Sequence, residues 1–479
     1  MKFLYYDIIF LVIACIAIAL FLYKNRKKLQ VESKIMLLYR TKVGVKFIEK
    51  ISKKYPRLIG IFSYISIFFG YILMIGALYL IITSLIIFIQ AVSLPKIPPL
   101  FPLIPYLPEI FKLDFLPPFY FTYWIISIAI VAVCHEFTHG IFARFGKIKI
   151  KSTGFGFLGP FLAAFVEMDE KQASKKSVKT QLAILSGGSF ANLVLTILFM
   201  IILNLFFISC YAPSGMNFNT YSISLVNASS ITSLANIGIA NPSLEKVLMA
   251  YDQLNLNKTD DIKILANNKT YFTNYQLFGI QLKNKQNQGL VIAYDNTPAY
   301  NNKITGAIKE IDYQDIKFKI SNQSDLALAL SKLQPGDNIT LGTTTADYNI
   351  TLANNPINSS QAYLGIGVLK PTSKLAWLAD FIVAKNDIST YYAPKYGGEW
   401  ASLTIFIYNL LFWIIIINAS VMLVNMLPFG IFDGGRFFFL TILGLTKSKK
   451  IAEKAFGVMN FIIIMLLFLL MAVWFFKIV

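Results

Sequence analysis

The amino-acid sequence predicts a polytopic α-helical membrane protein of about six spans, with a β-rich extracytoplasmic domain between spans four and five. Hydrophobic residues make up 56% of the chain and charged residues only 14%, a balance well outside that of soluble proteins. Apolar runs of spanning length recur along the sequence, and one long polar stretch interrupts them after the fourth run. These observations argue against an ordinary soluble protein.

Each predicted span is an apolar run of about 20 residues or more, the length that a helix needs to cross the hydrocarbon core of a bilayer. The second run is longer than one crossing requires, so it is expected to tilt or to protrude. The runs are 4–23, 58–92, 119–143, 182–208, 403–427 and 455–476.

The distribution of charge predicts the orientation of these spans. Residues 24–57 hold 12 basic and 2 acidic residues, residues 144–179 hold 8 and 3, and residues 436–454 hold 5 and 1. Short basic connections are typical of cytoplasmic loops. Residues 210–400 carry 15 basic and 14 acidic residues, so the stretch 210–402 is expected outside. The net charge of +19 therefore reflects topology, and the expected partner is the lipid bilayer, not nucleic acid.

Seven Asn-X-Ser/Thr sequons within residues 210–400 support the same orientation, because such acceptors are typical of externally exposed domains. An Asn- and Thr-rich composition would also generate them by chance. They lie at Asn227, Asn257, Asn268, Asn322, Asn338, Asn349 and Asn358.

A short motif on the third span indicates a metal site. The only two histidines of the chain, His135 and His139, flank Glu136 in the segment HEFTH. Histidines at i and i+4 lie on one face of a helix and can bind one Zn²⁺, while the intervening glutamate can accept a proton from water. The alternative is a helix with two polar side chains bonded to neighbours, but ionisable groups within a span are costly. Cys134 points away from His135 and is expected to be apolar filler.

A catalytic zinc site needs a third protein ligand, and two carboxylates are candidates. Glu167 is the nearest carboxylate downstream, but with Asp169 and Glu170 it better fits an acidic cluster on the inner surface. Asp433 is the stronger candidate, because it is a lone carboxylate in an apolar stretch at the same predicted depth as HEFTH. Two glycines after Asp433 allow a close approach of backbone. The alternative role for Asp433 is the N-cap of a following helix.

The pairing of HEFTH with the later pattern N-x-x-P-x-x-x-x-D-G, residues 425–434, resembles the site-2 protease family of intramembrane zinc metalloproteases. The segment SGGSFAN, residues 186–192, is also similar to that family. The resemblance implies one zinc ion per chain and cleavage of single-span regulatory membrane proteins within their transmembrane segments, near the cytoplasmic face. The implied site residues are His135, His139 and Asp433 as ligands, Glu136 as catalytic base and Asn425 in substrate binding.

The sequence divides into seven segments. A PDZ-like domain is expected where a helix over 326–333 is followed by a Pro-Gly-Asp turn and a strand, with 288–292 as a weak candidate for a peptide-binding loop; a generic β-rich domain is the alternative. The segments are the first span with a basic amphipathic inner-face segment of helical spacing (1–57), the second span with a proline-rich outer cap (58–118), spans three and four with a glycine-rich hairpin (119–209), an extracytoplasmic region of unknown type (210–284), the PDZ-like domain (285–355), a linker (356–402), and spans five and six with the aspartate ligand (403–479).

Two other classes of function stay open at this point. A non-catalytic membrane peptide-binding protein with a structural zinc site would need a fourth protein ligand, and no residue is a convincing one. A transporter with an intramembrane ion site would move ions and release no peptide. The sequence does not determine the oligomeric state.

Overall fold

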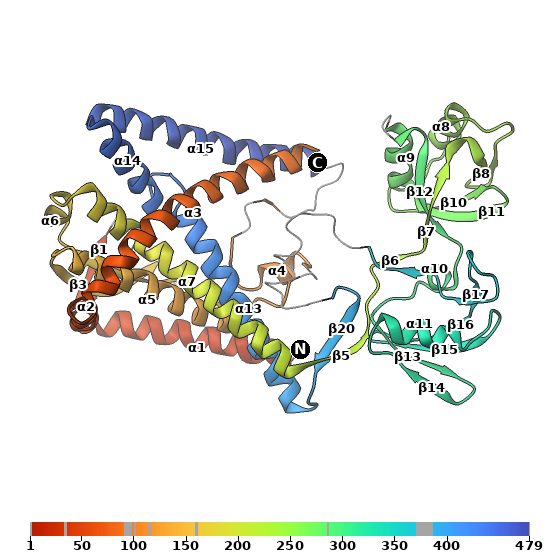
Figure 1. Cartoon of the computed structure of the whole chain (residues 1–479), viewed down its shortest axis with the longest axis horizontal. Helices are drawn as coiled ribbons and strands as arrows, with labels where there is room; N and C mark the ends of the chain where they lie inside the picture. Colours follow the sequence, from red (N-terminus) through yellow and green to blue (C-terminus); the bar gives the residue numbers. More distant parts are fainter. Residues whose placement is uncertain are drawn as a thin grey trace. The chain divides into compact units, whose positions relative to one another are not determined.

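A computed structural model describes the chain as two compact units, Met1–Phe207 with Ser402–Val479, and Ile208–Ala401 (Figure 1). The residues described are 2–32, 36–90, 98–99, 102–113, 116–158, 161–284, 287–369 and 387–478. Part of the predicted proline-rich cap and part of the predicted linker lie outside these residues.

The first unit is built on long apolar helices. The described part of the chain contains six helices long and apolar enough to cross a membrane, the number that the sequence predicts. An apolar run becomes a helix in hydrocarbon because a helix satisfies all of its own backbone hydrogen bonds. These helices are α1 (Lys2–Lys24), α3 (Pro56–Gln90), α5 (Phe121–Phe145), α7 (Val178–Cys210), α13 (Glu399–Asn425) and α15 (Lys449–Ile478).

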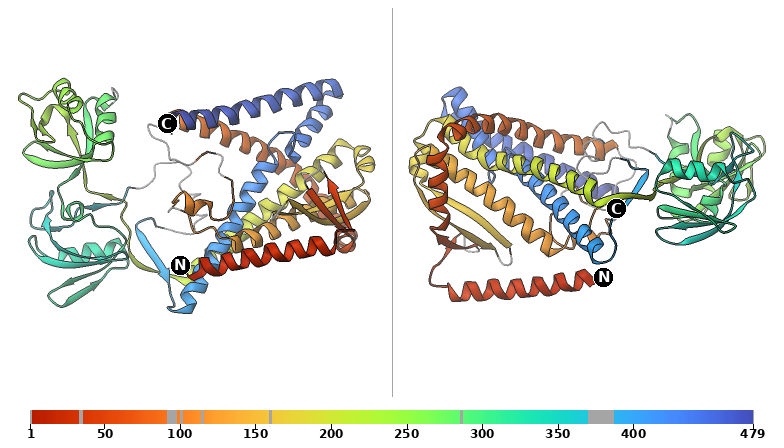
Figure 2. Two further views of the ribbon diagram at one scale, coloured as in Figure 1. Left: turned by 180° about the vertical axis from the view of Figure 1, so that it is seen from behind. Right: turned by 60° about the horizontal axis from the view of Figure 1, so that its bottom comes forward.

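The first unit also contains an antiparallel sheet of four strands, in the order β1-β2-β3-β4. Its strands are β1 (Leu29–Glu32), β2 (Met36–Thr41), β3 (Ile150–Leu158) and β4 (Phe161–Met168). Strands β3 and β4 form the predicted hairpin, which lies between α1 and α5 (Figure 2). Gly154 is needed in it, because a Cβ atom there would lie 2.2 Å from the backbone oxygen of Tyr39 in β2.

The sequence predicts a helix for the basic inner-face segment, and this prediction is wrong for the first half of that segment. Strands β1 and β2 occupy Leu29–Glu32 and Met36–Thr41, and only α2 (Val43–Lys54) is a helix. Strand β2 pairs with β3, which is more than a hundred residues away in the sequence. Such long-range pairing overrides local periodicity, because the preference for strand depends on cross-strand neighbours.

A tight irregular segment, residues 426–432, joins α13 to α14 (Asp433–Thr446). A Cβ atom on Gly434 would lie 2.3 Å from the backbone carbon of Met426, and one on Gly435 would lie 2.3 Å from the backbone oxygen of Phe429. The predicted close approach of backbone at these glycines is confirmed. It sets Asp433 at the first residue of α14.

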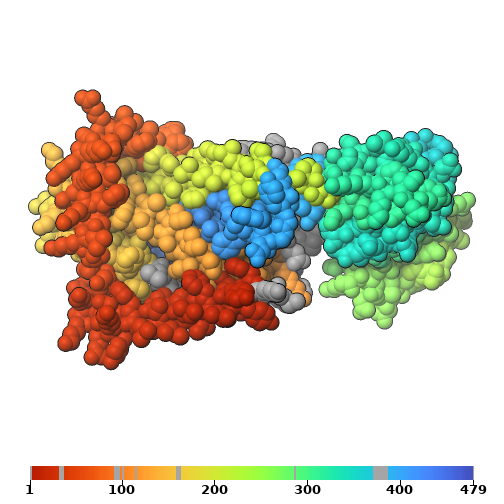
Figure 3. Space-filling view, turned by 90° about the horizontal axis from the view of Figure 1, so that it is seen from below, coloured from red at the N-terminus to blue at the C-terminus, as the bar shows by residue number. Residues whose placement is uncertain are grey.

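Helix α1 is fastened to α5 by one buried carboxylate. Asp7 is only 1% exposed, and it accepts hydrogen bonds from the backbone N–H groups of Phe121 and Thr122, each at 2.9 Å. These amides begin α5 and have no partner within that helix. The hydroxyl of Tyr106, just before α4 (Leu107–Ile110), also donates to Asp7, and burial with this contact raises the pKa of Tyr106. Elsewhere α1 is largely uncovered (Figure 3).

The second unit contains two sheets, each with its own hydrophobic core. The first is ordered β7-β12-β11-β10-β8-β9 and carries α8 (Leu244–Asp252) and α9 (Tyr275–Lys283). Its strands are β7 (Ile223–Asn227), β8 (Ile231–Leu234), β9 (Ile237–Gly238), β10 (Asp261–Ala266), β11 (Lys269–Asn274) and β12 (Leu290–Asp295).

The second sheet is ordered β16-β15-β13-β5-β20, with β14 beside β13. Helices α10 (Pro298–Asn301) and α11 (Gln323–Ser331) belong to the same part of the chain. Its strands are β5 (Tyr211–Met216), β13 (Ile308–Tyr313), β14 (Ile316–Lys319), β15 (Asn338–Thr343), β16 (Asp347–Thr351) and β20 (Thr390–Pro394). Two short pairs, β17 (Ala353–Asn354) with β18 (Ala362–Tyr363), and β6 (Thr220–Tyr221) with β19 (Ile366–Gly367), complete the unit.

Strand pairing divides this unit differently from the boundary expected at 284/285. Strand β12 pairs with β7 and β11 of the first sheet, whereas β5 and β20, from the two ends of the unit, join the second. The expected loop 288–292 leads into β12, so it lies in a different sheet from the strands that follow α11. Helix α11, the turn and β15 are present as expected, and the PDZ-like likeness stays a prediction.

Candidate metal centre

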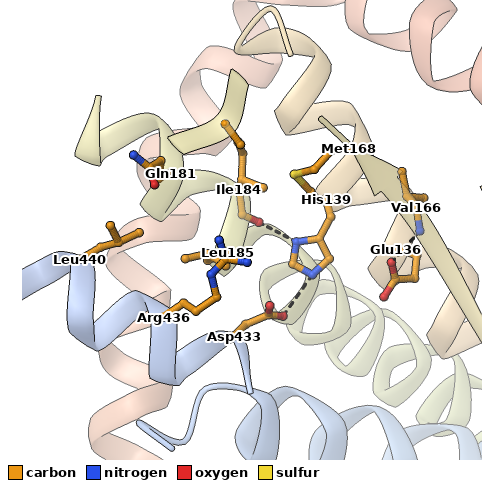
Figure 4. A pocket seen from close by; sticks show the side chains of 11 residues that line it. Glu136, His139, Val166, Met168, Gln181, Ile184, Leu185, Asp433, Arg436 and Leu440 are labelled. Carbon is orange, nitrogen blue, oxygen red and sulfur yellow. Dashed lines mark hydrogen bonds and ion pairs between the residues drawn. The ribbon is translucent and has the colours of Figure 1, made fainter. Parts of the chain in front are cut away.

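Three side chains from two helices meet in the first unit. His135 and His139 lie one turn apart on α5, and Asp433 reaches them from the start of α14. The two Nε2 atoms are 3.0 Å apart, and Oδ2 of Asp433 lies 3.5 Å from Nε2 of His135 and 3.2 Å from Nε2 of His139. Figure 4 shows His139 between Asp433 and the carbonyl of Ile184. The structure thus brings together the three residues expected as ligands.

The outer nitrogen of each imidazole is held by α7. Nδ1 of His139 lies 2.6 Å from the carbonyl oxygen of Ile184; because a carbonyl only accepts, Nδ1 carries the proton and Nε2 has a lone pair. Nδ1 of His135 lies 3.0 Å from the side-chain amide of Asn192, whose buried Oδ1 has no partner among the described residues. Turning this amide by 180° places Oδ1 against Nδ1, so that Nδ1 donates to it as Nδ1 of His139 donates to Ile184. We assign this orientation, so Nε2 of His135 also has a lone pair.

The arrangement fits a metal ion. With these tautomers, the three facing atoms carry lone pairs and no hydrogen, and such atoms repel one another unless a cation lies among them. Imidazole nitrogen and carboxylate oxygen are ligands of Zn²⁺, and atoms about 2.0–2.1 Å from a tetrahedral ion are roughly 3.3 Å apart. The separations of 3.0, 3.2 and 3.5 Å bracket that value. A histidine ligand whose other nitrogen donates to a carbonyl is also typical of metal sites.

Gly188 of α7 makes room for the two imidazoles. A Cβ atom on it would lie 2.4 Å from Nε2 of His139 and 2.6 Å from Nε2 of His135. From the sequence alone, the segment SGGSFAN is only a family likeness. The structure gives it specific roles, since Gly188 and Asn192 both contact the histidine pair.

Glu136 lies beside this group, on a cavity of about 190 Å³ that His139 and Asp433 also line. Its Oε2 accepts a hydrogen bond from the backbone N–H of Val166 in β4 at 3.0 Å. Oε1 makes no hydrogen bond within the described residues, so one oxygen is fixed by the hairpin and the other is available to a proton.

Of the two remaining candidate residues, Asn425 lies at the centre and Glu167 does not. Nδ2 of Asn425, at the end of α13, lies 3.5 Å from Nε2 of His135, so this amide is beside the centre. Glu167, the other candidate for third ligand, lies elsewhere: its Oε2 is 2.9 Å from Nε of Arg40 and accepts a hydrogen bond from Ser152 at 2.6 Å. The Ser152 hydrogen bond and the Arg40 charge lower the pKa of Glu167.

The helices and the His-His-Asp group define a class of protein, a polytopic membrane protein with a candidate metal centre. Comparison with known families identifies it further: the model of peptidase family M50 matches residues 123–470. That range is more than half of the chain, so the protein belongs to peptidase family M50, the site-2 protease family. The resemblance drawn from the sequence is confirmed, and membership supports a metallopeptidase integral to the membrane.

One curated relative also matches part of the chain. The sequence is 33% identical over 194 residues to "Uncharacterized protein MJ0971" of Methanocaldococcus jannaschii. The match covers 39% of this chain and 48% of that protein, so the chain spans about half the length of the curated relative.

Proposed function

We propose that this protein is a zinc-dependent intramembrane endopeptidase of the site-2 type. Its proposed substrates are single-span regulatory membrane proteins, cut within their transmembrane segments. The observation that carries the proposal is the convergence of the facing Nε2 atoms of His135 and His139 with the carboxylate of Asp433. Family M50 membership supports the peptidase activity.

The proposed chemistry assigns one role to each residue. When bound by the two histidines and Asp433, the ion would supply a Lewis acid that polarises a carbonyl oxygen and acidifies water. Glu136 would accept the proton of the attacking water at Oε1 and pass it to the leaving nitrogen. The Val166 N–H holds Oε2 and so limits rotation of the carboxylate. The amide of Asn425 would donate a hydrogen bond to the substrate carbonyl.

The proposed orientation places the centre near the cytoplasmic face and the unit Ile208–Ala401 outside. In support, α5 ends at Phe145 and leads into residues 144–179, which hold 8 basic and 3 acidic residues. His139 lies five residues before Arg144, about 8 Å along the helix axis. Water would therefore reach the centre from the inner side.

The substrate must lose its helical structure around the scissile bond. A helix buries each carbonyl in its own hydrogen bond, so a spanning helix is protected from attack until it unwinds locally. We expect cleavage to favour single-span segments with helix-weakening residues near their inner end.

The test combines zinc analysis with a cleavage assay on purified full-length protein. Single-span reporters are incubated with the zinc-loaded protein, and the released peptides are identified by mass. A peptidase yields two fragments from within the span and loses this activity on chelation. Tight zinc with no fragments in any reporter would instead favour the structural-zinc class, and metal flux into vesicles without fragments would favour a transporter.

A further inference from the structure

A second cavity lies at the ends of α3, α5 and α7 that adjoin the basic connections. Its volume is about 510 Å³, within the roughly 300–1,000 Å³ typical of small-ligand sites. None of its lining residues lines the cavity at the metal centre, so it is a separate site. Its apolar wall comes from Phe142 and Phe145 at the end of α5, and its polar wall from the start of α7.

Three lysines line this cavity from two places in the chain. Lys147 follows α5, Lys176 precedes α7, and Lys179 lies in the first turn of α7. No carboxylate of the described residues is within ion-pair distance of any of them, whereas Arg144 nearby pairs with Glu49 at 3.4 Å. Ammonium groups that share a cavity repel one another, so the site is electrostatically prepared for an anion.

Neighbouring groups position this positive charge. Nζ of Lys179 lies 3.3 Å from the centre of the Tyr64 ring on α3, a cation–π contact that restrains the ammonium at the wall. The hydroxyls of Ser177 and Thr180 lie 2.9 Å apart and bond to each other. One of the two hydroxyls donates this hydrogen bond and the other accepts it. The accepting hydroxyl therefore still has its own hydrogen to donate to a ligand.

We propose that this cavity binds the phosphate headgroup of an anionic phospholipid from the inner leaflet. A basic pocket between spanning helices on the cytoplasmic side suits such a headgroup. We choose the lipid over free phosphate because the cavity adjoins the bilayer-facing side of a candidate spanning helix: Tyr64 is 62% exposed, and the α3 residues Ile61 and Phe68 are 56% and 62% exposed. This apolar surface gives the acyl chains a place to lie, and a soluble anion would leave it unused.

The test measures lipid retained by the full chain in detergent, where no bilayer surface attracts the other lysines. Native mass spectrometry compares added phosphatidylglycerol with phosphatidylcholine. We expect one retained phosphatidylglycerol per chain. The triple variant Lys147→Gln, Lys176→Gln, Lys179→Gln should weaken this retention on the order of a hundredfold, about fivefold per lysine.

The matched control is the triple variant Lys447→Gln, Lys450→Gln, Lys454→Gln. It removes the same charge from another connection expected on the inner side, and Lys447 has the same left-handed backbone as Lys147, with φ of 54° against 59°. Retention should be unchanged in this control. If the cavity triple does not fold, Lys179→Gln alone should still weaken retention about fivefold.

Three results would overturn the assignment. Equal losses in both triple variants would indicate diffuse charge attraction. Equal retention of phosphatidylcholine would exclude recognition of an anionic headgroup. Displacement of phosphatidylglycerol by inorganic phosphate at the same concentration would identify a soluble anion site. None of these measurements depends on peptidase activity.

Discussion

A methyl group on Gly188 of α7 would lie 2.4 Å from Nε2 of His139 on α5. That distance is well inside van der Waals contact, so the ligand pair rests directly against the backbone of α7. The same helix bonds the outer nitrogens of both histidines through Ile184 and Asn192. Helix α7 therefore fixes the imidazoles although it supplies no ligand.

Gly188→Ala should lower zinc occupancy and abolish cleavage, because the added methyl displaces both imidazoles. Elemental analysis of the purified variant measures the loss. Gly76→Ala on α3 is the control, since a Cβ atom there meets only Leu423 at 4.0 Å. Full zinc content in Gly188→Ala would mean that the pair can shift without losing the ion.

Asn192→Ala should reduce zinc affinity about 10–100-fold, the usual effect of removing a partner that orients a histidine ligand. Competition with a fluorescent chelator measures this affinity. Asn204→Ala is the control on the same helix, because the amide of Asn204 donates to Met200 of its own helix. Equal affinities in the two variants would remove the orienting role of Asn192.

Asp433→Asn should lower zinc occupancy, whereas Glu167→Gln should leave it unchanged. Asp433 lies within 3.5 Å of both imidazoles, but Glu167 is bonded to Arg40 and Ser152. Parallel elemental analysis of both variants decides between the two carboxylates. The reverse pattern would make Glu167 the third ligand.

Glu136→Gln should keep zinc and slow cleavage by about 10²–10⁴-fold, the usual contribution of general acid–base catalysis. The amide oxygen of glutamine can still accept from the Val166 N–H, so the fold should persist. Single-turnover cleavage of a zinc-loaded variant is the measurement. Wild-type rates in that variant would show that another group moves the proton.

Asp7→Ala should destabilise the first unit by about 1–3 kcal/mol, because it leaves buried N–H groups at the start of α5 without an acceptor. Thermal unfolding in detergent measures the change. Tyr106→Phe removes only one donor to the same carboxylate and should cost about 1 kcal/mol. A larger loss in Tyr106→Phe than in Asp7→Ala would contradict this account of how α1 is fastened.

Local patterns are enough to predict the spans and the ligand candidates. Continuous apolar runs become helices, and i, i+4 spacing places His135 and His139 on one face. Local patterns do not predict the hydrogen-bond partners of these histidines. Ile184 and Asn192 are 45 and 57 residues away in the sequence from the histidines that they contact. No periodicity in either segment encodes that contact. The small residues and the amide of the SGGSFAN motif are the one local signal from which this contact could have been inferred.

The same limit explains the errors in the strands. Strand β2 adopts its form by pairing with β3, and β12 belongs to the first sheet of the second unit by pairing with β7. Each pairing joins residues that are distant in the sequence, so alternation within one segment does not reveal it. Helices, whose hydrogen bonds are local, are predicted more reliably for that reason.

Strands β5 and β20 are antiparallel partners, with Tyr211 opposite Pro394 and one shift of register between Tyr391 and Tyr392. The points where the polypeptide enters and leaves the second unit are therefore neighbours, a hydrogen-bonded distance apart. A gene segment encoding such a unit can be inserted, exchanged or deleted while the flanking polypeptide needs only a short bridge. The protein is accordingly organised for modular replacement of its large insertion, independently of the helices that hold the candidate metal centre.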